Sequence, residues 1–505
     1  MDKSEVFKRR LDLVDFSDAH SIFEYSSHLP GMTFRDVLDL GIAPPGKTVI
    51  LEYNSARYKG GLGVLLEERY FGYPANSDDR PDFHEAGLEL KATCYDVRKN
   101  NRLSAGERLV LSMIPYDREV SDNLYESHLW TKLRSILLID YHRDKAREKL
   151  DQTITHTTLF YPPQEDLAIL EEDYRTIISY VRAGRADELS EGLTTYLGAC
   201  TKGESANKMW VEQFYPRVDE DGVERRHLAK KRAFCLKRQY MDYLLHTLVL
   251  KETDNSESLV KSVPVGKLPF EQIIESSVAQ HIGKTDRELC KELGLDYTGN
   301  KAQWTTLVYR ILGIKSNKAK EFIKAGISVR TIRIEENGSI KESLSLDPFK
   351  FKEVAQETWD NSPLRAYFDE TRFFFVAFKH TENGYQLAGS LFWNMPQSDI
   401  EGALKQCWQE TRSVIQAGVK LDVKPQSNGS IRIANNLPGS SDNPVAHVRP
   451  HSSRRAYRLP GLTDIGDVER DANELPDGRW MTTQSFWLNN TYLARILRPI
   501  IGPAK

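Results

Sequence analysis

Three residues whose side chains can work together in catalysis, Asp82, Glu89 and Lys91, lie close together in the first fifth of the chain. They follow the order Pro-Asp, six residues, Glu-x-Lys. The run Leu88–Ala92 alternates apolar and polar residues, which predicts a β-strand with Glu89 and Lys91 on one face. Asp82 follows a proline, and Gly87 permits a turn between it and the strand.

Two carboxylates that converge on one point repel each other unless a cation lies between them. Hard oxygen ligands with open positions suit Mg²⁺, which can polarise a phosphodiester and activate a water molecule. Lys91 can orient the nucleophile and balance the growing negative charge. The apolar and charged pattern at 62–71 predicts a helix, from which Glu67 can reach the same centre. The alternative is a chance motif on a solvent-exposed strand of alternating Glu and Lys.

A partly altered copy of the segment that contains Asp82, Glu89 and Lys91 occurs at 321–331. Phe, Ala-Gly and an aliphatic residue keep their spacing, but Ser328 stands in place of Glu89 and Arg330 in place of Lys91. Glu321 is the remaining acid of this degenerate site. One intact and one altered copy indicate a duplicated nuclease with a single working centre.

Other landmarks recur in the same order, which supports duplication. Strand-like runs at 108–112 and 341–345 are followed by Pro-Gln-x-Asp helix starts near 164 and 397, and each of these helices is expected to end at an Ala-Gly. Phe-x-Leu phrases at 234 and 486 then lead into terminal amphipathic helices. We therefore expect a catalytic domain at 1–250, a polar linker at 251–268 and an inactive DNA-binding domain at 269–505.

The composition fits a globular protein of more than one domain. The 505 residues are 40% hydrophobic and 28% charged, with a formal net charge of −3, and no apolar run is long enough to span a bilayer. The five cysteines form no CxxC pair, which is typical of reduced thiols and a cytoplasmic location. Basic runs at 225–238, 315–324 and 449–458 are candidate nucleic-acid surfaces, although each alone could be a solvated helix face.

The phrases 59–67, Asp82-Phe83 and Gly87–Thr93 resemble the MutH mismatch-repair endonucleases within the PD-(D/E)xK superfamily. Longer phrases in both halves, including 188–197, 447–451 and 480–487, are similar to the GATC-specific type II restriction endonucleases of the Sau-three-A-I / MutH family. The resemblance implies two tandem MutH-like domains, each an α/β (mixed α+β) fold with a central mixed sheet flanked by helices. It also implies catalysis by Glu67, Asp82, Glu89 and Lys91, with Glu67, Asp82 and Glu89 binding Mg²⁺.

The family's Arg-Pro-Lys turn near the recognised bases matches Cys200-Thr201-Lys202 in the first half and Arg449-Pro450-His451 in the second. Lysine and arginine donors suit the guanine acceptors of GATC in the major groove, and others can contact phosphates. The predicted DNA-binding residues are Thr201, Lys202, Lys237, Arg238, Arg449, His451, Arg454, Arg455 and Arg458.

The sequence thus predicts a Mg²⁺-dependent restriction endonuclease that hydrolyses double-stranded DNA at GATC, with a second domain that binds another site as an allosteric effector. The alternatives are a nicking endonuclease of DNA repair and a non-catalytic GATC-binding protein. We expect a monomer in solution that can associate on DNA and has no membrane partner. The cognate methyltransferase of the restriction–modification system would act on the same sites without having to bind this protein. Methylation sensitivity and individual base contacts are left open.

Overall fold

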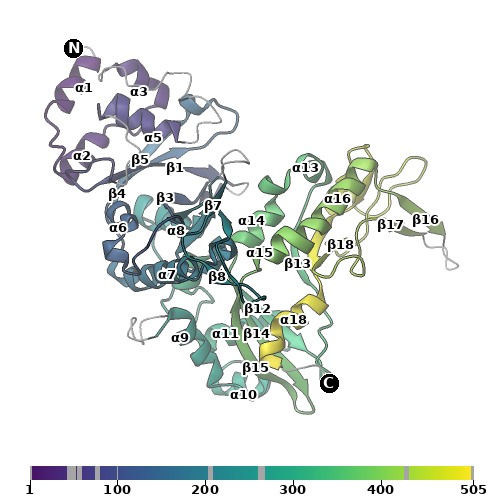
Figure 1. Ribbon diagram of the computed structural model, residues 1–505. Helices are drawn as coiled ribbons and strands as arrows, with labels where there is room; N and C mark the ends of the chain where they lie inside the picture. Colours follow the sequence, from purple (N-terminus) through teal and green to yellow (C-terminus); the bar gives the residue numbers. More distant parts are fainter. Residues whose placement is uncertain are drawn as a thin grey trace. The chain divides into compact units, whose positions relative to one another are not determined.

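The computed structural model describes residues 3–41, 53, 60–73, 80–98, 101–202, 209–259, 268–425 and 431–501. The chain divides into two units, each of which we describe by itself (Figure 1). Unit 1 comprises Met1–Phe270 and Lys318–Gly326, and unit 2 comprises Glu271–Asn317 and Ile327–Lys505. The sequence boundaries at 250 and 269 did not anticipate that 318–326 packs with the first half. Residues 260–267 of the expected linker lie outside the described residues.

The helices and strands of unit 1 are α1 (Lys3–Leu11), α2 (Ala19–Ser26), α3 (Phe34–Leu40), α5 (Gly61–Leu65), η1 (Leu66–Tyr70), β1 (Glu89–Val97), β2 (Leu103–Ala105), β3 (Leu109–Met113), η2 (Leu124–Glu126), α6 (His128–Leu133), β4 (Ile136–His142), η3 (Lys149–Asp151), β5 (Thr153–Phe160), α7 (Gln164–Arg182), η4 (Ala186–Glu188), η5 (Glu191–Leu193), β6 (Leu197–Thr201), β7 (Trp210–Glu212), β8 (Arg217–Val218), β9 (Glu224–Arg225), β10 (Leu228–Lys230), β11 (Arg232–Leu236), α8 (Arg238–Leu244), η7 (Leu245–Val249) and α12 (Lys320–Ala325).

The largest sheet of unit 1 has the strand order β2-β1-β4-β5, in which β1 runs parallel to β4 and antiparallel to β2. Leu90 on β1 and Ile139 on β4 pack into a core with Phe34 of α3 and Leu65 of α5. Figure 1 shows α1, α2, α3 and α5 gathered beside this sheet. Because side chains alternate along a strand, Glu89 and Lys91, which lie two residues apart, point to the face opposite that of Leu90. The predicted strand at 88–92 and helix at 62–71 are both confirmed.

The second sheet of unit 1, β3-β11-β6, is antiparallel throughout. The expected helix after Pro163 is α7, which ends at Arg182 with Ala183 as its C-cap and Gly184 in the left-handed conformation (φ +67°). That glycine fits closely against the backbone of Tyr215 and Pro216, so an added Cβ would not fit there. The helix end predicted from Ala-Gly is therefore confirmed.

The helices and strands of unit 2 are α9 (Phe270–Ala279), α10 (Asp286–Glu292), α11 (Lys301–Ile311), β12 (Ser328–Ile334), β13 (Leu344–Pro348), α13 (Phe351–Gln356), η8 (Trp359–Asn361), α14 (Pro363–Glu370), β14 (Phe373–Thr381), β15 (Gly384–Trp393), α15 (Gln397–Asp399), η9 (Ile400–Leu404), α16 (Lys405–Ala417), β16 (Leu421–Pro425), β17 (Ile431–Asn435), β18 (Ala446–Pro450), α17 (Val468–Asp471), β19 (Ala472–Glu474), β20 (Trp480–Thr482), β21 (Gln484–Leu488) and α18 (Asn490–Ile501).

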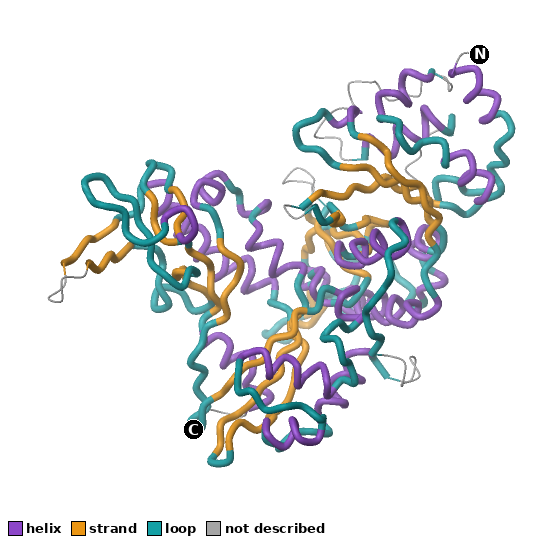
Figure 2. The backbone as a smooth tube through the Cα atoms, turned by 180° about the vertical axis from the view of Figure 1, so that it is seen from behind, coloured by secondary structure: helices purple, strands orange, loops and turns teal. Residues whose placement is uncertain are grey.

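Unit 2 repeats the strand pairing of unit 1. In the sheet β12-β14-β15, β12 is parallel to β14, which is antiparallel to β15, as in β1-β4-β5. The sheet β13-β21-β18 is antiparallel, as is β3-β11-β6. Figure 2 shows the long strands β14 and β15 with helices beside them. Phe373, Phe375 and Met395 lie in the buried core of this unit.

The mixed α/β class predicted from the sequence is confirmed, but a single central sheet in each half is not what the structure shows. Within the described residues the strands form several small sheets, of which the largest has four strands. All five cysteines are buried and outside disulfides. None of the helices in the described ranges has the length and apolarity that a membrane crossing requires.

Candidate active site

Strand β1 places Glu89 and Lys91 side by side at the edge of the predicted centre. The Lys91 ammonium lies 2.5 Å from Oε1 of Glu89, whose side chain is 1% exposed. An ordinary surface Glu/Lys pair would be solvated, so the burial of Glu89 argues against the alternative of a solvent-exposed strand.

The turn before β1 fixes Asp82 against the strand. Phe83 and Leu88 exchange two backbone hydrogen bonds of 2.9 and 3.1 Å, and Gly87 between them has φ +62°. Oδ2 of Asp82 accepts the backbone N–H of Leu90 at 2.8 Å, and the backbone N–H of Asp82 donates to Oε2 of Glu89 at 3.3 Å. The six-residue spacing between the acids is thus the length of one closed turn.

Glu67 joins this cluster from η1, a π-helical turn that continues α5. Such single turns often occur at functional sites. Burial and then the charge of Asp82 raise the pKa of Glu67 to about 8, while Lys91 opposes the shift. Its neighbour Glu68 is engaged elsewhere, since it accepts a hydrogen bond of 2.5 Å from the Tyr53 hydroxyl.

The electrostatics of the site are those of a buried, acid-rich cluster. Burial and then Glu89 raise the pKa of Asp82 to about 6. Burial by itself would lower the pKa of Lys91, but the charges of Glu89 and Asp82 outweigh it and raise that pKa. The acids therefore favour a nearby positive charge.

Lys132 is a further member of the site that the sequence analysis missed. Its ammonium, carried by α6, lies 3.3 Å from both carboxylate oxygens of Glu89. Lys132 precedes β4, and β4 pairs in parallel with β1 so that Ile136 stands opposite Glu89. Lys132 could have been identified as a lysine that directly precedes the strand paired with β1. The sequence alone does not reveal that β4 is this strand.

Glu67, Asp82 and Glu89 fit a hard divalent cation by donor type, and burial followed by mutual repulsion raises the pKa values of Glu67 and Asp82. Across the described ranges, no group of three or more His, Cys, Asp or Glu side chains has the arrangement of a ready metal site. At this centre, the ammonium groups of Lys91 and Lys132 lie against the carboxylate oxygens of Glu89.

The predicted recognition turn of unit 1 follows β6. The carboxylate of Asp173 anchors the start of this strand by accepting the backbone N–H groups of Thr195, Tyr196 and Leu197 at 2.7, 2.6 and 2.9 Å. Thr201 ends the strand, and the backbone N–H of Lys202 donates to the carbonyl of Lys231.

Lys237 and Arg238, both predicted to contact DNA, differ in exposure. Lys237 is fully buried and donates to the carbonyl oxygen of Thr194, so its position is that of a structural lysine and not of a phosphate contact. Arg238 is half-buried at the start of α8. Consecutive basic residues in sequence therefore do not form one basic surface here.

The predicted DNA-binding residues of unit 2 lie on and after β18, and all are exposed. Arg449 lies over the Trp487 ring at 4.9 Å, and His451 is 3.2 Å from the hydroxyl of Ser485. Arg458 pairs with Asp464 and Glu469, and Arg455 donates to a backbone carbonyl. Arg454 is exposed beside them.

The altered copy occupies the same strand register as the intact one. Ser328 pairs with Phe373 at the start of β12 as Glu89 pairs with Ile136, and Arg330 pairs with Phe375 as Lys91 pairs with Leu138. Glu321 does not join them, because its carboxylate accepts hydrogen bonds from Ser258 and Leu259 within unit 1.

Known proteins match this chain over residues of the acidic cluster. The family model for the DNA mismatch repair enzyme MutH matches residues 71–173, a range that includes Asp82, Glu89, Lys91 and Lys132. The type II restriction enzyme Sau3AI of Staphylococcus aureus is 33% identical over 485 residues, which cover 90% of this chain and 96% of that enzyme. The chain belongs to the Sau3AI family of type II restriction enzymes.

The resemblance predicted from the sequence is thereby confirmed. MutH proteins of Haemophilus ducreyi and Actinobacillus pleuropneumoniae are 25% and 26% identical to this chain, and each match covers 39% of it. The match to Sau3AI spans both units, whereas the MutH family model falls within unit 1. The match to Sau3AI covers 90% of the chain, and the MutH family model covers the segment with Asp82, Glu89 and Lys91 but not Glu67.

Proposed function

We propose that this protein is a Mg²⁺-dependent restriction endonuclease that hydrolyses double-stranded DNA at GATC. The observation that carries the proposal is the cluster of Glu67, Asp82, Glu89 and Lys91 in unit 1, with Lys132 beside it. Glu67 and Glu89 are buried, and Asp82 and Lys91 are half-buried. Membership in a restriction-enzyme family supports DNA as the substrate.

The residues of the cluster divide the work. Lys91 is placed to stabilise negative charge that develops on the phosphate and to orient the attacking water. Lys132 holds Glu89 from the other side, and the backbone N–H of Leu90 holds Asp82. When bound to Glu67, Asp82 and Glu89, Mg²⁺ would supply Lewis-acid polarisation of the phosphodiester. Hydrolysis would leave a 5′-phosphate and a 3′-hydroxyl.

Unit 2 is proposed to bind a second GATC site and not to cut it. Ser328 and Arg330 stand where unit 1 has its acid and its lysine, so the unit keeps the strand frame but not the acids that would bind the metal. The exposed Arg449, His451 and Arg454 are donors suited to DNA on this unit.

Two alternatives are less well supported. A nicking repair enzyme has no use for a second, tethered DNA-binding unit. A non-catalytic GATC-binding protein would not need the intact cluster of unit 1.

The proposal is tested with plasmids that carry one or two GATC sites. We expect faster cleavage of the two-site plasmid, and stimulation of one-site cleavage by an added GATC duplex. Equal rates without stimulation would remove the effector role of unit 2. Cleavage by a folded Glu89→Ala variant would show that the centre lies elsewhere.

A further inference from the structure

A small two-stranded sheet in unit 1 carries an exposed tryptophan beside a lysine. Strands β7 and β10 are antiparallel, with Trp210 opposite Lys230 and Glu212 opposite Leu228. Residues opposite each other share a face of the sheet, so these four side chains lie together. On the other face, Ala229 is fully buried. The outward face exposes 48% of Trp210 and 58% of Leu228.

This face adjoins the predicted recognition turn. The carbonyl of Lys231, the residue after β10, accepts the backbone N–H of Lys202, and the N–H of Lys231 donates to Met209 at 2.7 Å. Thr201 pairs with Arg232 one residue further along. The residue that follows Lys230 is thus hydrogen-bonded to the turn that is expected to read DNA.

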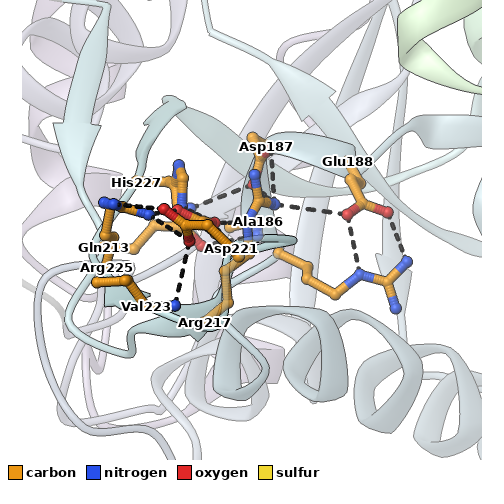
Figure 3. A network of polar contacts seen from close by, with 11 residues as sticks. Ala186, Asp187, Glu188, Gln213, Arg217, Asp221, Val223, Arg225 and His227 are labelled. Carbon is orange, nitrogen blue, oxygen red and sulfur yellow. Dashed lines mark hydrogen bonds and ion pairs between the residues drawn. The ribbon is translucent and has the colours of Figure 1, made fainter.

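The hairpin between β7 and β10, residues 213–227, is held in place by ion pairs (Figure 3). Arg217 lies 3.1 Å from Asp187, Arg225 lies 2.8 Å from Asp221, and the ring of His227 lies 2.7 Å from Asp219. The side chain of Gln213 accepts the backbone N–H of Ala186 at 2.8 Å, which joins the hairpin to η4. Several acidic residues of the hairpin are therefore paired with basic residues of the same hairpin. These ion pairs and the hydrogen bond to η4 hold the hairpin in position.

The outward side chains combine cations with aromatic rings. The Lys230 ammonium lies 5.6 Å from the centroid of the Trp210 ring, and the Arg226 guanidinium lies 5.6 Å from that of Phe214. An aromatic ring beside a cation is a combination that contacts nucleic acid well, because the ring covers apolar sugar and base edges while the cation meets a phosphate. Glu212 lies opposite Leu228 on the same face, two residues along the sheet from the pair of Trp210 and Lys230.

We propose that Trp210 and Lys230 form a DNA contact next to the recognition turn, in which the indole packs on duplex that flanks the GATC site and Lys230 neutralises a phosphate. This inference rests on the proposed function, because it assumes that the protein binds duplex DNA. It selects Lys230 from the basic run at 225–238 and adds Trp210, and neither residue belongs to the predicted set of DNA-binding residues.

The test measures binding of a fluorescent duplex with one central GATC to the full chain in the cleavage-deficient Glu89→Gln background. Trp210→Ala is expected to weaken binding about tenfold, or about 1.4 kcal/mol, and to leave the salt dependence unchanged. Lys230→Gln is expected to reduce the slope of log K against log salt by about 0.9, the value for one phosphate contact.

Tyr297→Ala is the matched control, since Tyr297 of unit 2 is 44% exposed and its ring centroid lies 4.6 Å from the Arg287 guanidinium. It should bind as the parent does. Unchanged affinity of folded Trp210→Ala, together with an unchanged salt slope of Lys230→Gln, would overturn the inference. Unchanged affinity with lost self-association would assign the face to a second copy of the chain and would also overturn it. If the parent itself fails to bind duplex DNA, the proposed function fails instead.

Discussion

The ammonium group of Lys132 lies 3.3 Å from each carboxylate oxygen of Glu89. Glu89 therefore has a lysine on both sides, one from its own strand and one from α6. Three carboxyl groups and two ammonium groups share the centre, which leaves an excess of one negative charge when all are ionised. This arrangement leads to the first two predictions.

Replacement of Lys132 by methionine should slow single-turnover cleavage, because Glu89 loses one of the two cations that hold it. Loss of one stabilising group in a catalytic centre costs on the order of 10²–10³-fold in rate. Lys132→Arg should retain more activity than Lys132→Met, while exposed Lys145→Met serves as the control. A Lys132→Met variant that cleaves at the parent rate would leave that lysine without a functional role.

A divalent cation should stabilise the folded protein through the carboxylate cluster. At a metal concentration ten times the Kd, the stabilisation is about 1.4 kcal/mol, since only the folded state offers the site. Thermal unfolding with and without Ca²⁺, which lacks the octahedral preference of Mg²⁺, would measure this in the parent and in Glu67→Gln. The shift should shrink in Glu67→Gln, and an equal shift in both would place the cation elsewhere.

Rebuilding the altered copy should not create a second catalytic centre. In the Glu89→Gln background, the combined Ser328→Glu and Arg330→Lys changes restore two residue types at the matching register. They do not supply the counterpart of Asp82, since Ser258 and Leu259 hold the carboxylate of Glu321. A plasmid assay should show no cleavage, and recovered cleavage would show that unit 2 needs fewer acids than unit 1.

Asp140 should make the stability of the protein depend on pH. It is 4% exposed, its Oδ2 has no hydrogen-bond partner, and burial raises its pKa to about 7. The unfolded carboxyl loses its proton near pH 4, so between about pH 4 and 7 only the folded state keeps it. The stabilising contribution is thus present below about pH 4 and is lost as the pH rises through 7.

Asp140→Asn should therefore unfold at higher temperature than the parent at pH 8, by an amount that falls toward zero at pH 4. The upper limit of the difference is about 4 kcal/mol. Thermal unfolding at several pH values measures it, with exposed Asp117→Asn as the control. A difference between Asp140→Asn and parent that does not change with pH would contradict the assignment.

The local parts of the site were predictable from the sequence, because strand alternation fixes which side chains share a face. Glu89, Lys91 and the turn from Asp82 follow from spacing alone. Lys132 was missed because its approach to Glu89 depends on the pairing of β4 with β1, a contact between residues far apart in the chain. The burial of Lys237, which donates to the carbonyl oxygen of Thr194, was not predictable, because that partner is 43 residues away in sequence and the neighbouring Arg238 stays half-buried.

The boundary between the two units was also missed, because it depends on contacts between residues far apart in the chain. Residues 318–326 follow α11 of unit 2 in sequence, yet α12 packs with unit 1, where Lys324 pairs with the buried carboxylate of Asp166 at 2.7 Å. Local composition gives no sign of such a long-range pair. The degenerate phrase at 321–331 is consequently divided between two units, although its strand part keeps the register of the intact copy.

The central claim is that unit 1 cuts DNA at GATC through Glu89 and its neighbours. The most direct measurement is digestion of unmethylated and methylated plasmid DNA with Mg²⁺, followed by sequencing of the ends produced by the parent and by Glu89→Gln. We expect 5′-phosphorylated ends at GATC from the parent and none from the variant. Ends at other sequences, or the same ends from the variant, would contradict it.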